Sequence, residues 1–565
     1  MKLTGAQLIT RLLERQSVRT IAGIPGGANL PLYDALHASE IRHVLARHEQ
    51  GAGFIAQGMA RASGQPAVCF GTSGPGATNL VTAIADAKLD SIPLIAITGQ
   101  VPRAMIGTDA FQEIDTYGLT IPITKHNYLV RSAAELLDVI PDAFRVAMSG
   151  RPGPVVIDVP KDVQNESLDV DTFPDPGTAD AVPSPLPDAL AQAAALISHA
   201  RRPLLLIGAG VIAANASADL RRLAERASVP VAATLLGLGA MPSDHPLFVG
   251  MIGMHAARYT NLLLEDCDLL IAIGVRFDDR ATGKIAEFCP RAKIIHVDID
   301  ASEIGKLTRP FLGVEADAGA CIAALLPLID SQTRRSWRER MDYLRTNFPL
   351  AMPGADDLTE PYGIIRHTAA LVGDEAIVTS DVGQHQMWVA QAFPFARPRQ
   401  WLTSGGLGTM GFGLPAAIGA ALTEPDRPVV CFTGDGSLLM NIQELGTAAE
   451  EGVNIKLILL NNGHLGLVRQ QQQLFYGGRY HASRFHAEPD FAAIARGFGI
   501  QAIDLDGARD PLAELACGLR EPGPCLVNVR IAADANVYPM VPPGAANREM
   551  IDYHSPGGSY ADLTA

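Results

Sequence analysis

Cysteines and basic residues are scarce in this 565-residue chain, and each shortage excludes a class of protein. The seven cysteines include no C-x-x-C pair, so neither a zinc cluster nor a disulfide framework is predicted. A sparse, odd number of thiols is typical of a reducing compartment, which predicts a cytoplasmic protein. Because 45 Lys and Arg stand against 60 Asp and Glu, the net charge is −15, and nucleic acid is not expected as a partner.

Long hydrophobic runs are also lacking. No stretch approaches ~18 uncharged apolar residues, so no membrane span is predicted. The N-terminus has no signal-peptide core; instead, Thr4 and Gln7 have the spacing of a capping box that opens an amphipathic helix. The composition, with 48% hydrophobic and 19% charged residues, is globular, and about 150 residues per domain predicts three or four domains.

Short apolar runs alternate with helical patterns in three stretches, which indicates three doubly wound α/β domains with parallel sheets. We expect an N-terminal domain at 1–165, a central domain at 188–335, a C-terminal domain at 370–535 and an irregular tail or lid at 536–565. Residues 173–187, rich in Pro, Asp and Ala, are the predicted linker. The predicted strands are 20–24, 41–45, 67–70, 92–97 and 155–159, then 204–207, 269–273 and 294–297, then 376–379, 429–432, 455–460 and 525–529.

Polar residues follow two strands of the third domain. The strand 429–432 leads to Gly434-Asp435-Gly436-Ser437, and the strand 455–460 leads to Asn461-Asn462. Because carboxyl ends of parallel strands meet at one edge, the Asp435 and Asn462 side chains can share a Mg²⁺ ion, with a main-chain carbonyl near His464 as a third ligand. Glycines and a helix expected to start at Ser437 suit an approaching diphosphate. Each motif alone is an ordinary turn, but together they predict a metal–diphosphate site.

A carboxylate in the first domain is the acid/base candidate. The strand 41–45 leads to Arg47-His48-Glu49-Gln50 and a helix. Thiamine chemistry needs a carboxylate on the aminopyrimidine to favour its imino tautomer, and Glu49 stands where that group is expected. Taken alone, Glu49 is better explained as a helix N-terminal glutamate favoured by the helix dipole. The two halves of the site meet within one chain or across a subunit interface, and we expect at least a dimer.

These motifs resemble those of thiamine-diphosphate enzymes, and the whole chain is similar to the acetolactate synthase large-subunit family. The resemblance implies thiamine diphosphate, Mg²⁺ and an FAD without a redox role. The matching stretches are Gly23-Ile-Pro-Gly-Gly27, Thr72-Ser-Gly-Pro-Gly-Ala-Thr-Asn79, Gly107-Thr-Asp-Ala-Phe-Gln-Glu113, Ser149-Gly-Arg-Pro-Gly-Pro154, Arg276-Phe-Asp-Asp-Arg280, Asp381-Val-Gly-Gln-His-Gln386, Gly406-Leu-Gly-Thr-Met-Gly-Phe-Gly413 and Val541-Pro-Pro-Gly-Ala545.

The same resemblance implies individual roles. Glu49 activates the cofactor, Gly27 and Gln112 lie near the reacting carbon, and Arg276 grips the carboxylate of the acceptor. Met410 wedges under the cofactor and enforces its bent form. Contacts to the diphosphate side are implied for Val382, Gly383, Gln384, His385, Gly408, Gly436 and Ser437. FAD contacts are implied for Arg151, Gly208, Gly210, Thr234, Leu235, Met254, His255, Gly274, Arg276, Asp278, Arg280, Asp298 and Asp317.

The central domain also carries Gly208-Ala-Gly210-Val-Ile-Ala213 after a strand, which matches the dinucleotide pattern G-x-G-x-x-A. The following strand region, 229–234, has no acidic residue at its end, so a standard NAD dehydrogenase is excluded. Arg276 and Arg280 offer fixed positive charge to FAD; without the resemblance, a surface ion-pair network explains them equally well.

The implied reaction decarboxylates pyruvate and joins the fragment to pyruvate or 2-ketobutyrate, in branched-chain amino acid biosynthesis. Pyruvate oxidase, glyoxylate carboligase and the flavin-free fermentative synthase are the close alternatives. The Arg276–Arg280 motif argues against the fermentative form, and Glu49 argues against the carboligase. A non-catalytic regulatory protein with the same fold is the distant alternative, and the intact Glu49, Asp435 and Asn462 argue against it.

One position departs from the family pattern. Gln471 stands where many members of the family carry tryptophan, whose indole favours 2-ketobutyrate as acceptor. Because one methylene in an apolar pocket contributes only ~1–3 kcal/mol, we expect weak discrimination between the two acceptors. A homodimer or homotetramer is expected, with a small regulatory subunit as a candidate partner.

Overall fold

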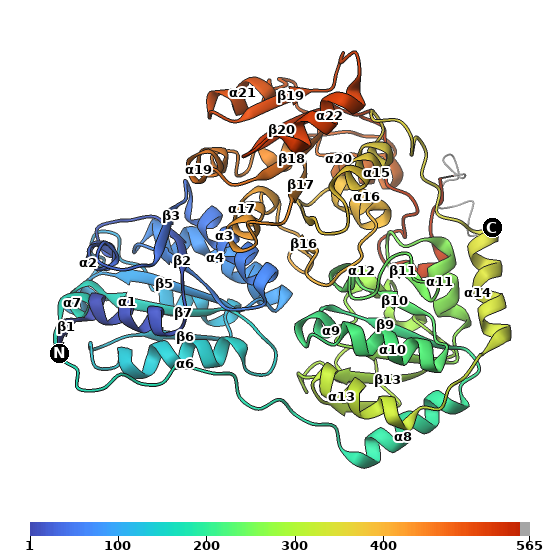
Figure 1. Ribbon diagram of the computed structural model, residues 1–565, viewed down its shortest axis with the longest axis horizontal. Helices are drawn as coiled ribbons and strands as arrows, with labels where there is room; N and C mark the ends of the chain where they lie inside the picture. The colour runs from blue at the N-terminus through green and yellow to red at the C-terminus, as the bar shows by residue number, and fades with distance from the viewer. Residues whose placement is uncertain (554–565) are drawn as a thin grey trace.

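The computed structural model describes residues 1–553 and consists of three α/β units (Figure 1). Each unit holds one six-stranded sheet. All strand pairs within these three sheets are parallel. Central strands such as β12 (Leu269–Ile273) and β18 (Ile455–Asn461) are buried along their whole length. Burial on both faces explains why these strands read as unbroken apolar runs rather than alternating patterns.

The N-terminal unit begins with α1 (Gly5–Arg15), which opens on the predicted capping box. Its sheet has the order β3–β2–β4–β5–β7–β6. The strands are β2 (Thr20–Gly23), β3 (Arg42–Leu45), β4 (Ala67–Gly71), β5 (Leu94–Gln100), β6 (His126–Leu129) and β7 (Val155–Pro160). The main helices are α2 (Leu30–Leu36), α3 (Glu49–Ser63), α4 (Pro75–Asp90), α6 (Leu136–Met148) and α7 (Lys161–Asn165).

The middle unit has the strand order β11–β10–β9–β12–β13–β14. Besides β12, its strands are β9 (Pro203–Ile207), β10 (Val231–Ala233), β11 (Phe248–Met251), β13 (Lys293–Asp298) and β14 (Leu312–Glu315). The helices include α8 (Pro187–His199), α10 (Ser217–Ala227), α11 (Arg258–Asp266), α13 (Ala318–Leu325) and α14 (Arg335–Asn347). Residues 170–186 before α8 hold no helix or strand, as the linker prediction requires.

The C-terminal unit has the order β16–β15–β17–β18–β20–β19. Besides β18, its strands are β15 (Ile377–Ser380), β16 (Trp401–Thr403), β17 (Val429–Gly434), β19 (Gln501–Asp504) and β20 (Cys525–Arg530). The helices include α15 (Pro361–Val372), α16 (Gln384–Ala392), α17 (Gly413–Thr423), α19 (Glu444–Glu451), α20 (Gly466–Phe475), α21 (Phe491–Gly497) and α22 (Pro511–Arg520).

The α/β class and all predicted strands are confirmed, with shifts of up to three residues at their ends. The sequence patterns missed β6, β11, β14, β16 and β19, and all five are edge strands of their sheets. Most of these edge strands are short and several are partly exposed, so their apolar signal is weak. A further pair was also missed: β1 (Lys2–Thr4) and β8 (Ser167–Asp169) form a small antiparallel sheet. The exact domain boundaries stay a prediction.

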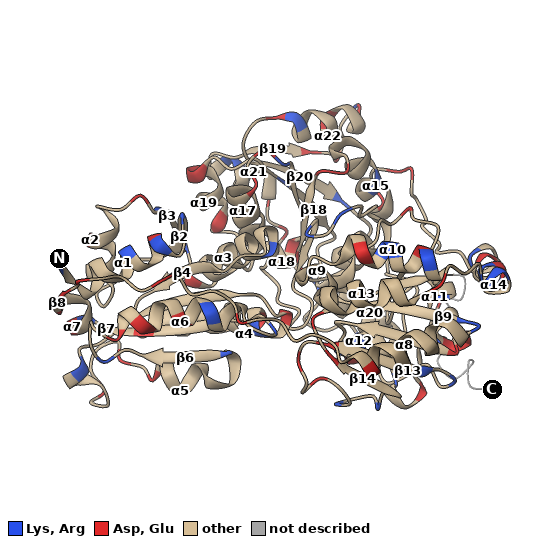
Figure 2. Ribbon diagram, turned by 60° about the horizontal axis from the view of Figure 1, so that its bottom comes forward, with Lys and Arg blue, Asp and Glu red and all other residues tan. Residues whose placement is uncertain are grey.

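The N- and C-terminal units meet through α3 and α17, which lie side by side in Figures 1 and 2. Glycines face the partner helix on both sides of this contact. A Cβ added at Gly58 would lie 2.2 Å from the Ala416 carbonyl oxygen, and one at Gly419 would lie 1.9 Å from that of Ile55. The two backbones therefore touch directly, and one buried hydrophobic cluster runs through both units.

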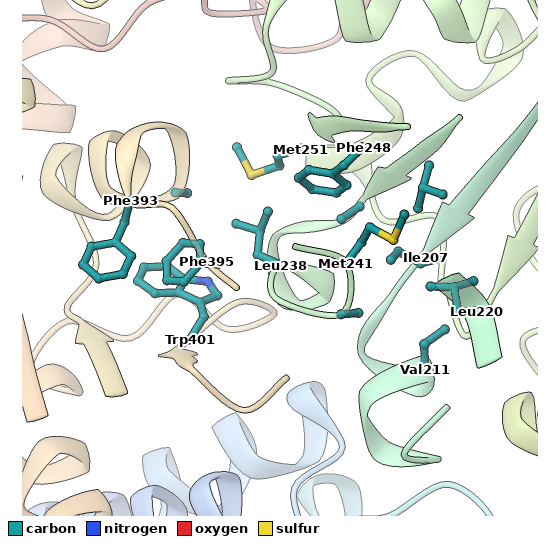
Figure 3. Packing of buried hydrophobic residues seen from close by; sticks show 14 of the residues in the cluster. Ile207, Val211, Leu220, Leu238, Met241, Phe248, Met251, Phe393, Phe395 and Trp401 are labelled. Atoms are coloured by element: carbon teal, nitrogen blue, oxygen red, sulfur yellow. The ribbon is translucent and has the colours of Figure 1, made fainter. Parts of the chain in front are cut away.

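The middle and C-terminal units share a second buried cluster. Figure 3 shows Phe393, Phe395 and Trp401 of the C-terminal unit beside Leu238 and Met251 of the middle unit. The ring centroids of Phe393 and Phe395 are 5.0 Å apart, as are those of Phe395 and Trp401. These ring pairs lie within the C-terminal unit, and the shared cluster packs them against apolar side chains of the middle unit.

The C-terminal tail, described as far as residue 553, packs on the middle unit. Met540 and Ile551 pair as a bridge, the Val541 N–H donates to the Met254 carbonyl at 2.8 Å, and Arg258 pairs with Asp552. The rest of the predicted tail or lid, 554–565, lies outside the described residues. Within residues 1–553, no helix combines the length and the apolar character needed to span a bilayer.

Candidate active site

A cavity lies at the carboxyl ends of β15, β17 and β18. Its lining includes most of the residues expected at the metal and diphosphate: Val382, Gly383, Gln384, His385, Met410, Asp435, Gly436, Ser437, Asn462 and His464. Gly408 is not among the lining residues, although it lies close to Val382. All residues of the lining belong to the C-terminal unit. The sequence therefore predicted which strand ends converge here.

The candidate metal ligands meet at one point of this cavity. Gly434 and Leu460 lie opposite each other in the β17–β18 ladder, so the residues that follow them emerge together. The backbone N–H groups of Gly463 and His464 act on the Asp435 carboxylate, while Asn462 Oδ1 accepts from the His464 N–H at 3.0 Å. Asp435 thus faces the turn that carries Asn462 and the main chain of His464.

Electrostatics at this point suit a cation. Burial raises the pKa of Asp435 to about 6 and outweighs the opposing backbone N–H groups. A divalent ion would compensate this buried carboxylate. The His464 ring lies within 2.8 Å of the Asn462 carbonyl, so its main chain is the better candidate ligand. Residues 1–553 contain no group of three or more His, Cys, Asp or Glu able to hold a metal, so further ligands would be amide, carbonyl, phosphate or water oxygens.

The diphosphate side differs from the sequence prediction in one respect. The helix expected from Ser437 begins at Asp435 and ends at Leu438, and Ser437 Oγ donates to the Val382 carbonyl at 2.8 Å. This helix is therefore a single turn that directly follows the end of β17. Nearby, desolvation lowers the pKa of buried His385 to about 3, and its Nε2 has no hydrogen-bond partner within residues 1–553. An unpartnered buried nitrogen in the lining fits a bound polar ligand.

The acid/base half of the site lies in the N-terminal unit. Glu49 is the first residue of α3 and is buried, and Asn79 Nδ2 donates to its Oε2 at 2.9 Å. Gly76 lies beside the other carboxylate oxygen. Asn79 was missed as a functional residue, although it closes the quoted motif Thr72–Asn79. Its position one turn after Pro75, at the start of the helix α4, is the feature of the sequence that could have identified it.

Gly27 and Gln112 belong to the same edge of the N-terminal sheet, after β2 and β5. Gln112 has a φ of 60° and packs against Gly74. Its loop is held by Glu113, which accepts the N–H groups of Thr108 and Ala110, both at 3.1 Å. These backbone hydrogen bonds, with that of Gly107 the largest contribution, lower the pKa of Glu113. The N-terminal unit thus presents Glu49, Gly27 and Gln112 together.

The cavity of the C-terminal unit is not shared with the residues expected in the N-terminal half of the site. The lining of the C-terminal cavity includes neither Glu49 nor any other residue of the N-terminal unit. The cavity holds about 60 Å³, which is the space of a few water molecules rather than of a whole coenzyme. A complete site would need a further wall beyond those that this chain provides to its own cavity.

The expected FAD residues gather at the carboxyl edge of the middle sheet. Each strand contributes: Gly208 and Gly210 follow β9; Thr234 and Leu235 follow β10; Met254 and His255 follow β11; Gly274, Arg276, Asp278 and Arg280 follow β12; Asp298 ends β13; and Asp317 follows β14. A Cβ at Gly208 would lie 2.1 Å from the Gly274 carbonyl oxygen, so the β9 and β12 turns touch. This edge is where doubly wound sheets bind ligands.

The charged residues at this edge of the sheet differ in their contacts: two aspartates cap helices, and two arginines make no tight ion pair among the described residues. Asp278 and Asp317 cap helices, accepting the N–H groups of Arg280 and Ala320. Among the described residues, Arg276 makes no ion pair within 4.0 Å, and its guanidinium lies against Gly406 of the C-terminal unit. Arg280 pairs only loosely, at 3.9 Å, with exposed Asp279. Arg276 is therefore available to an anion, whereas a tight surface ion-pair network is not formed.

Arg151 stands apart in the N-terminal unit and bridges to the middle unit. Its guanidinium contacts Asp300 at 3.3 Å and Glu303 at 2.8 Å. This ion pair brings Arg151 to the loop after β13, where burial raises the pKa of Asp298 to about 6. A cavity of about 310 Å³ with Lys88 and Lys125 in its wall adjoins this contact.

Family models match all three units. The N-terminal, central and C-terminal domains of thiamine pyrophosphate enzymes match residues 3–119, 190–325 and 381–529. The chain is 58% identical to the acetolactate synthase isozyme 1 large subunit of Escherichia coli (strain K12), covering 97% of this chain and 98% of that protein. It is 48% identical to the acetolactate synthase large subunit of Parasynechococcus marenigrum (97% and 91% covered) and 45% identical to that of Corynebacterium glutamicum (97% and 90%).

The conserved order of the three domain models and the near-complete coverage leave no unit unassigned. On this ground the chain belongs to the acetolactate synthase large-subunit family of thiamine pyrophosphate enzymes.

Proposed function

We propose that this chain is the catalytic subunit of an acetolactate synthase. It decarboxylates pyruvate and joins the two-carbon fragment to a second 2-keto acid, either pyruvate or 2-ketobutyrate. The observation that carries the proposal is the convergence of Asp435 with the Asn462–His464 turn in one cavity. Thiamine diphosphate, when bound, supplies the electron sink that decarboxylation of a 2-keto acid requires.

The protein's own contribution on the diphosphate side is binding and orientation. Asp435, the Asn462 side chain and the His464 main chain would hold Mg²⁺, which in turn ties down diphosphate oxygens. His385 Nε2, which has no hydrogen-bond partner among the described residues, offers a further polar group to a bound ligand. Met410 reaches the same cavity from the loop before α17 and would shape the space that the coenzyme occupies.

Glu49 would act from a second chain. Because the cavity is small and lacks an N-terminal wall, we propose a dimer in which each N-terminal unit closes the cavity of its partner. Asn79 holds Oε2 of Glu49, which leaves Oε1 to hold a proton against the coenzyme ring. A tetramer would be two such dimers.

The acceptor would be recognised at the junction of the units. Arg276, half-buried and without an ion pair among the described residues, can take the acceptor carboxylate in bidentate fashion, and Gln112 lies on the N-terminal half of the site. Gln471 sits half-buried on α20, one turn after the lining residue Leu467. It would allow both acceptors with little preference.

FAD would bind along the carboxyl edge of the middle sheet, without a redox role. The support is that all six strands of this sheet deliver a residue of the expected set, while Arg151 closes the set from the N-terminal unit. The printed names of the relatives are those of large subunits, which supports a small regulatory subunit as a partner. We place the protein in the cytoplasm, where its seven free thiols stay reduced.

The test is an acetolactate assay on the purified chain, read as acetoin after acid treatment. Pyruvate should give product only with thiamine diphosphate and Mg²⁺ present, and more with FAD, each being omitted in turn. Glu49→Gln should lower kcat at least about a hundredfold, whereas Glu225→Gln on the surface of the middle unit should not. Oxygen uptake without acetoin would indicate an oxidase and contradict the proposal. Sedimentation of the active species as a monomer would contradict the shared site.

A further inference from the structure

The loop 404–412 joins β16 to α17 and carries Gly408 and Met410, yet the N-terminal unit holds it. Two consecutive N–H groups of this loop donate to one side chain of α4. The Gly405 N–H donates to Asp90 Oδ2 at 3.0 Å, and the Gly406 N–H donates to Asp90 Oδ1 at 2.7 Å. Both oxygens of the Asp90 carboxylate are therefore spent on the backbone of another unit.

Asp86, one helical turn earlier on α4, holds the next part of the loop. Its Oδ2 accepts from Thr409 Oγ1 at 3.0 Å and also from Ser404 Oγ. Ser404 Oγ in turn accepts from the Thr409 N–H at 2.8 Å, which closes the loop upon itself. Thr409 directly precedes Met410, the residue that faces the cavity. On the other side of Met410, the Gly411 and Phe412 N–H groups donate to Asp381 Oδ1 of the C-terminal unit, at 2.7 and 3.2 Å.

Arg61 of α3 forms ion pairs with both carboxylates. Its Nη2 lies 3.2 Å from Asp86 Oδ1 and 2.8 Å from Asp90 Oδ2, and its Nη1 donates to the Thr403 carbonyl at 3.0 Å. The guanidinium also stacks over Phe412, 4.9 Å from the ring centroid. Arg61 thus touches both ends of the loop, while Asp86 and Asp90 hold its middle.

All three charges are withdrawn from water: the side chain of Arg61 is 7% exposed, and those of Asp86 and Asp90 are 0% exposed. Burying charges is costly unless each is paired and hydrogen-bonded. Adhesion between the units does not require this arrangement, because α3 and α17 already pack backbone to backbone. The carboxylates of Asp86 and Asp90 accept hydrogen bonds from the loop 404–412 and not from α17.

We propose that Asp86 and Asp90, both paired with Arg61, are positioning residues that fix the loop 404–412 and so place Met410 in the C-terminal cavity. The N-terminal unit would in this way set the shape of the coenzyme pocket in the same chain, besides presenting Glu49. The inference rests on the proposed function for the role of Met410. Neither Asp86 nor Asp90 is among the lining residues of that cavity.

Asp90→Asn and Asp86→Asn test the proposal. Three donors meet the two oxygens of Asp90: two N–H groups and Arg61. Asparagine offers one acceptor oxygen, so at least one donor would face an NH₂ group. Asp268→Asn is the matched control, because Asp268 accepts the consecutive N–H groups of Arg201 and Arg202 at 3.0 and 2.9 Å within the middle unit.

The first readout is amide hydrogen exchange of residues 405–409 in the coenzyme-free chain. Both loop variants should exchange there at least about tenfold faster than wild type, and Asp268→Asn should match wild type. The second readout is kinetic: the half-saturating concentration of thiamine diphosphate should rise and kcat should fall, each about tenfold, while the KM for pyruvate changes little.

Thr409 supplies a pair of variants that should fold in any case. Thr409→Ser keeps the hydroxyl that Asp86 accepts and should behave as wild type, whereas Thr409→Val should show the exchange and kinetic changes. Unchanged exchange of 405–409 in Asp90→Asn and Thr409→Val would overturn the proposal, as would equal effects in Asp268→Asn. The exchange experiment needs no activity, so failure of the proposed function alone would leave its result standing.

Discussion

Replacing Glu444 by alanine should destabilise the turn that carries Glu49. Glu444 lies at the start of α19 in the C-terminal unit and is 0% exposed. Its carboxylate accepts the N–H groups of Arg47 and His48, both at 3.0 Å, and the hydroxyl of Thr447 at 2.7 Å. Alanine would leave the two backbone N–H groups of this partly buried contact without their acceptor.

The size of the effect follows from those contacts. Each buried donor left unsatisfied costs about 1–3 kcal/mol, so the pair costs roughly 2–6 kcal/mol. For a unit of this size, 1 kcal/mol lowers Tm by about 2–4 °C, which gives a fall of roughly 4–24 °C for Glu444→Ala. Glu444→Gln keeps one acceptor oxygen and should lie between alanine and wild type. A fall in kcat should accompany the loss of the Glu49 turn.

Calorimetry of the purified chain measures this, with Glu450→Ala as the control. Glu450 lies on the same helix and pairs with Arg47, but its side chain is 54% exposed. A surface pair of this kind contributes less than about 1 kcal/mol, so its removal should lower Tm by less than about 4 °C. Equal melting of Glu444→Ala and Glu450→Ala would refute the reasoning.

Three further outcomes are expected. Burial raises the pKa of Asp158 from 3.8 to about 7, so between these values the folded chain holds a proton that the unfolded chain releases. The stability of the wild type should therefore fall relative to that of Asp158→Asn as pH rises from 4 to 7. A difference in Tm that does not change with pH would contradict this. Gly58→Ala should lose about 1–3 kcal/mol through the clash with Ala416, seen as a lower Tm, whereas Gly497→Ala, which meets no atom within 4 Å, should not. Gln471→Trp should raise the product ratio from 2-ketobutyrate over pyruvate on the order of tenfold in a competition assay; an unchanged ratio would remove this residue from acceptor choice.

The sequence carried the fold where local patterns are strong. Central strands such as β12 and β18 are buried throughout and produce long apolar runs, and the residues after β17 and β18 converge because strand geometry requires it. The four-residue helix after β17 was placed two residues late, because a single turn leaves no periodic pattern. Five of the six edge strands of the three parallel sheets were missed because each is only three or four residues long, and β6, β14 and β19 are also partly exposed.

Contacts between units could not be predicted. Nothing near Asp90 indicates that its partners are the amides of Gly405 and Gly406, more than 300 residues later. Nor does the sequence around Glu444 show that it holds the turn before Glu49. Side chains of this kind depend on how whole units dock, and that information is spread over many positions rather than held in a motif.

The direct contact of α3 with α17 has a consequence for variation within the family. At Gly58 and Gly419 the backbone of one helix touches the backbone of the other. Changes of side-chain size at this contact therefore cannot shift one unit gradually relative to the other. Within one chain, this contact fixes the edge bearing Glu49 relative to the edge bearing Asp435. Adaptation to a new acceptor would therefore occur at side chains near the cavity, such as Gln471, which can be replaced without changing the relative position of the two units.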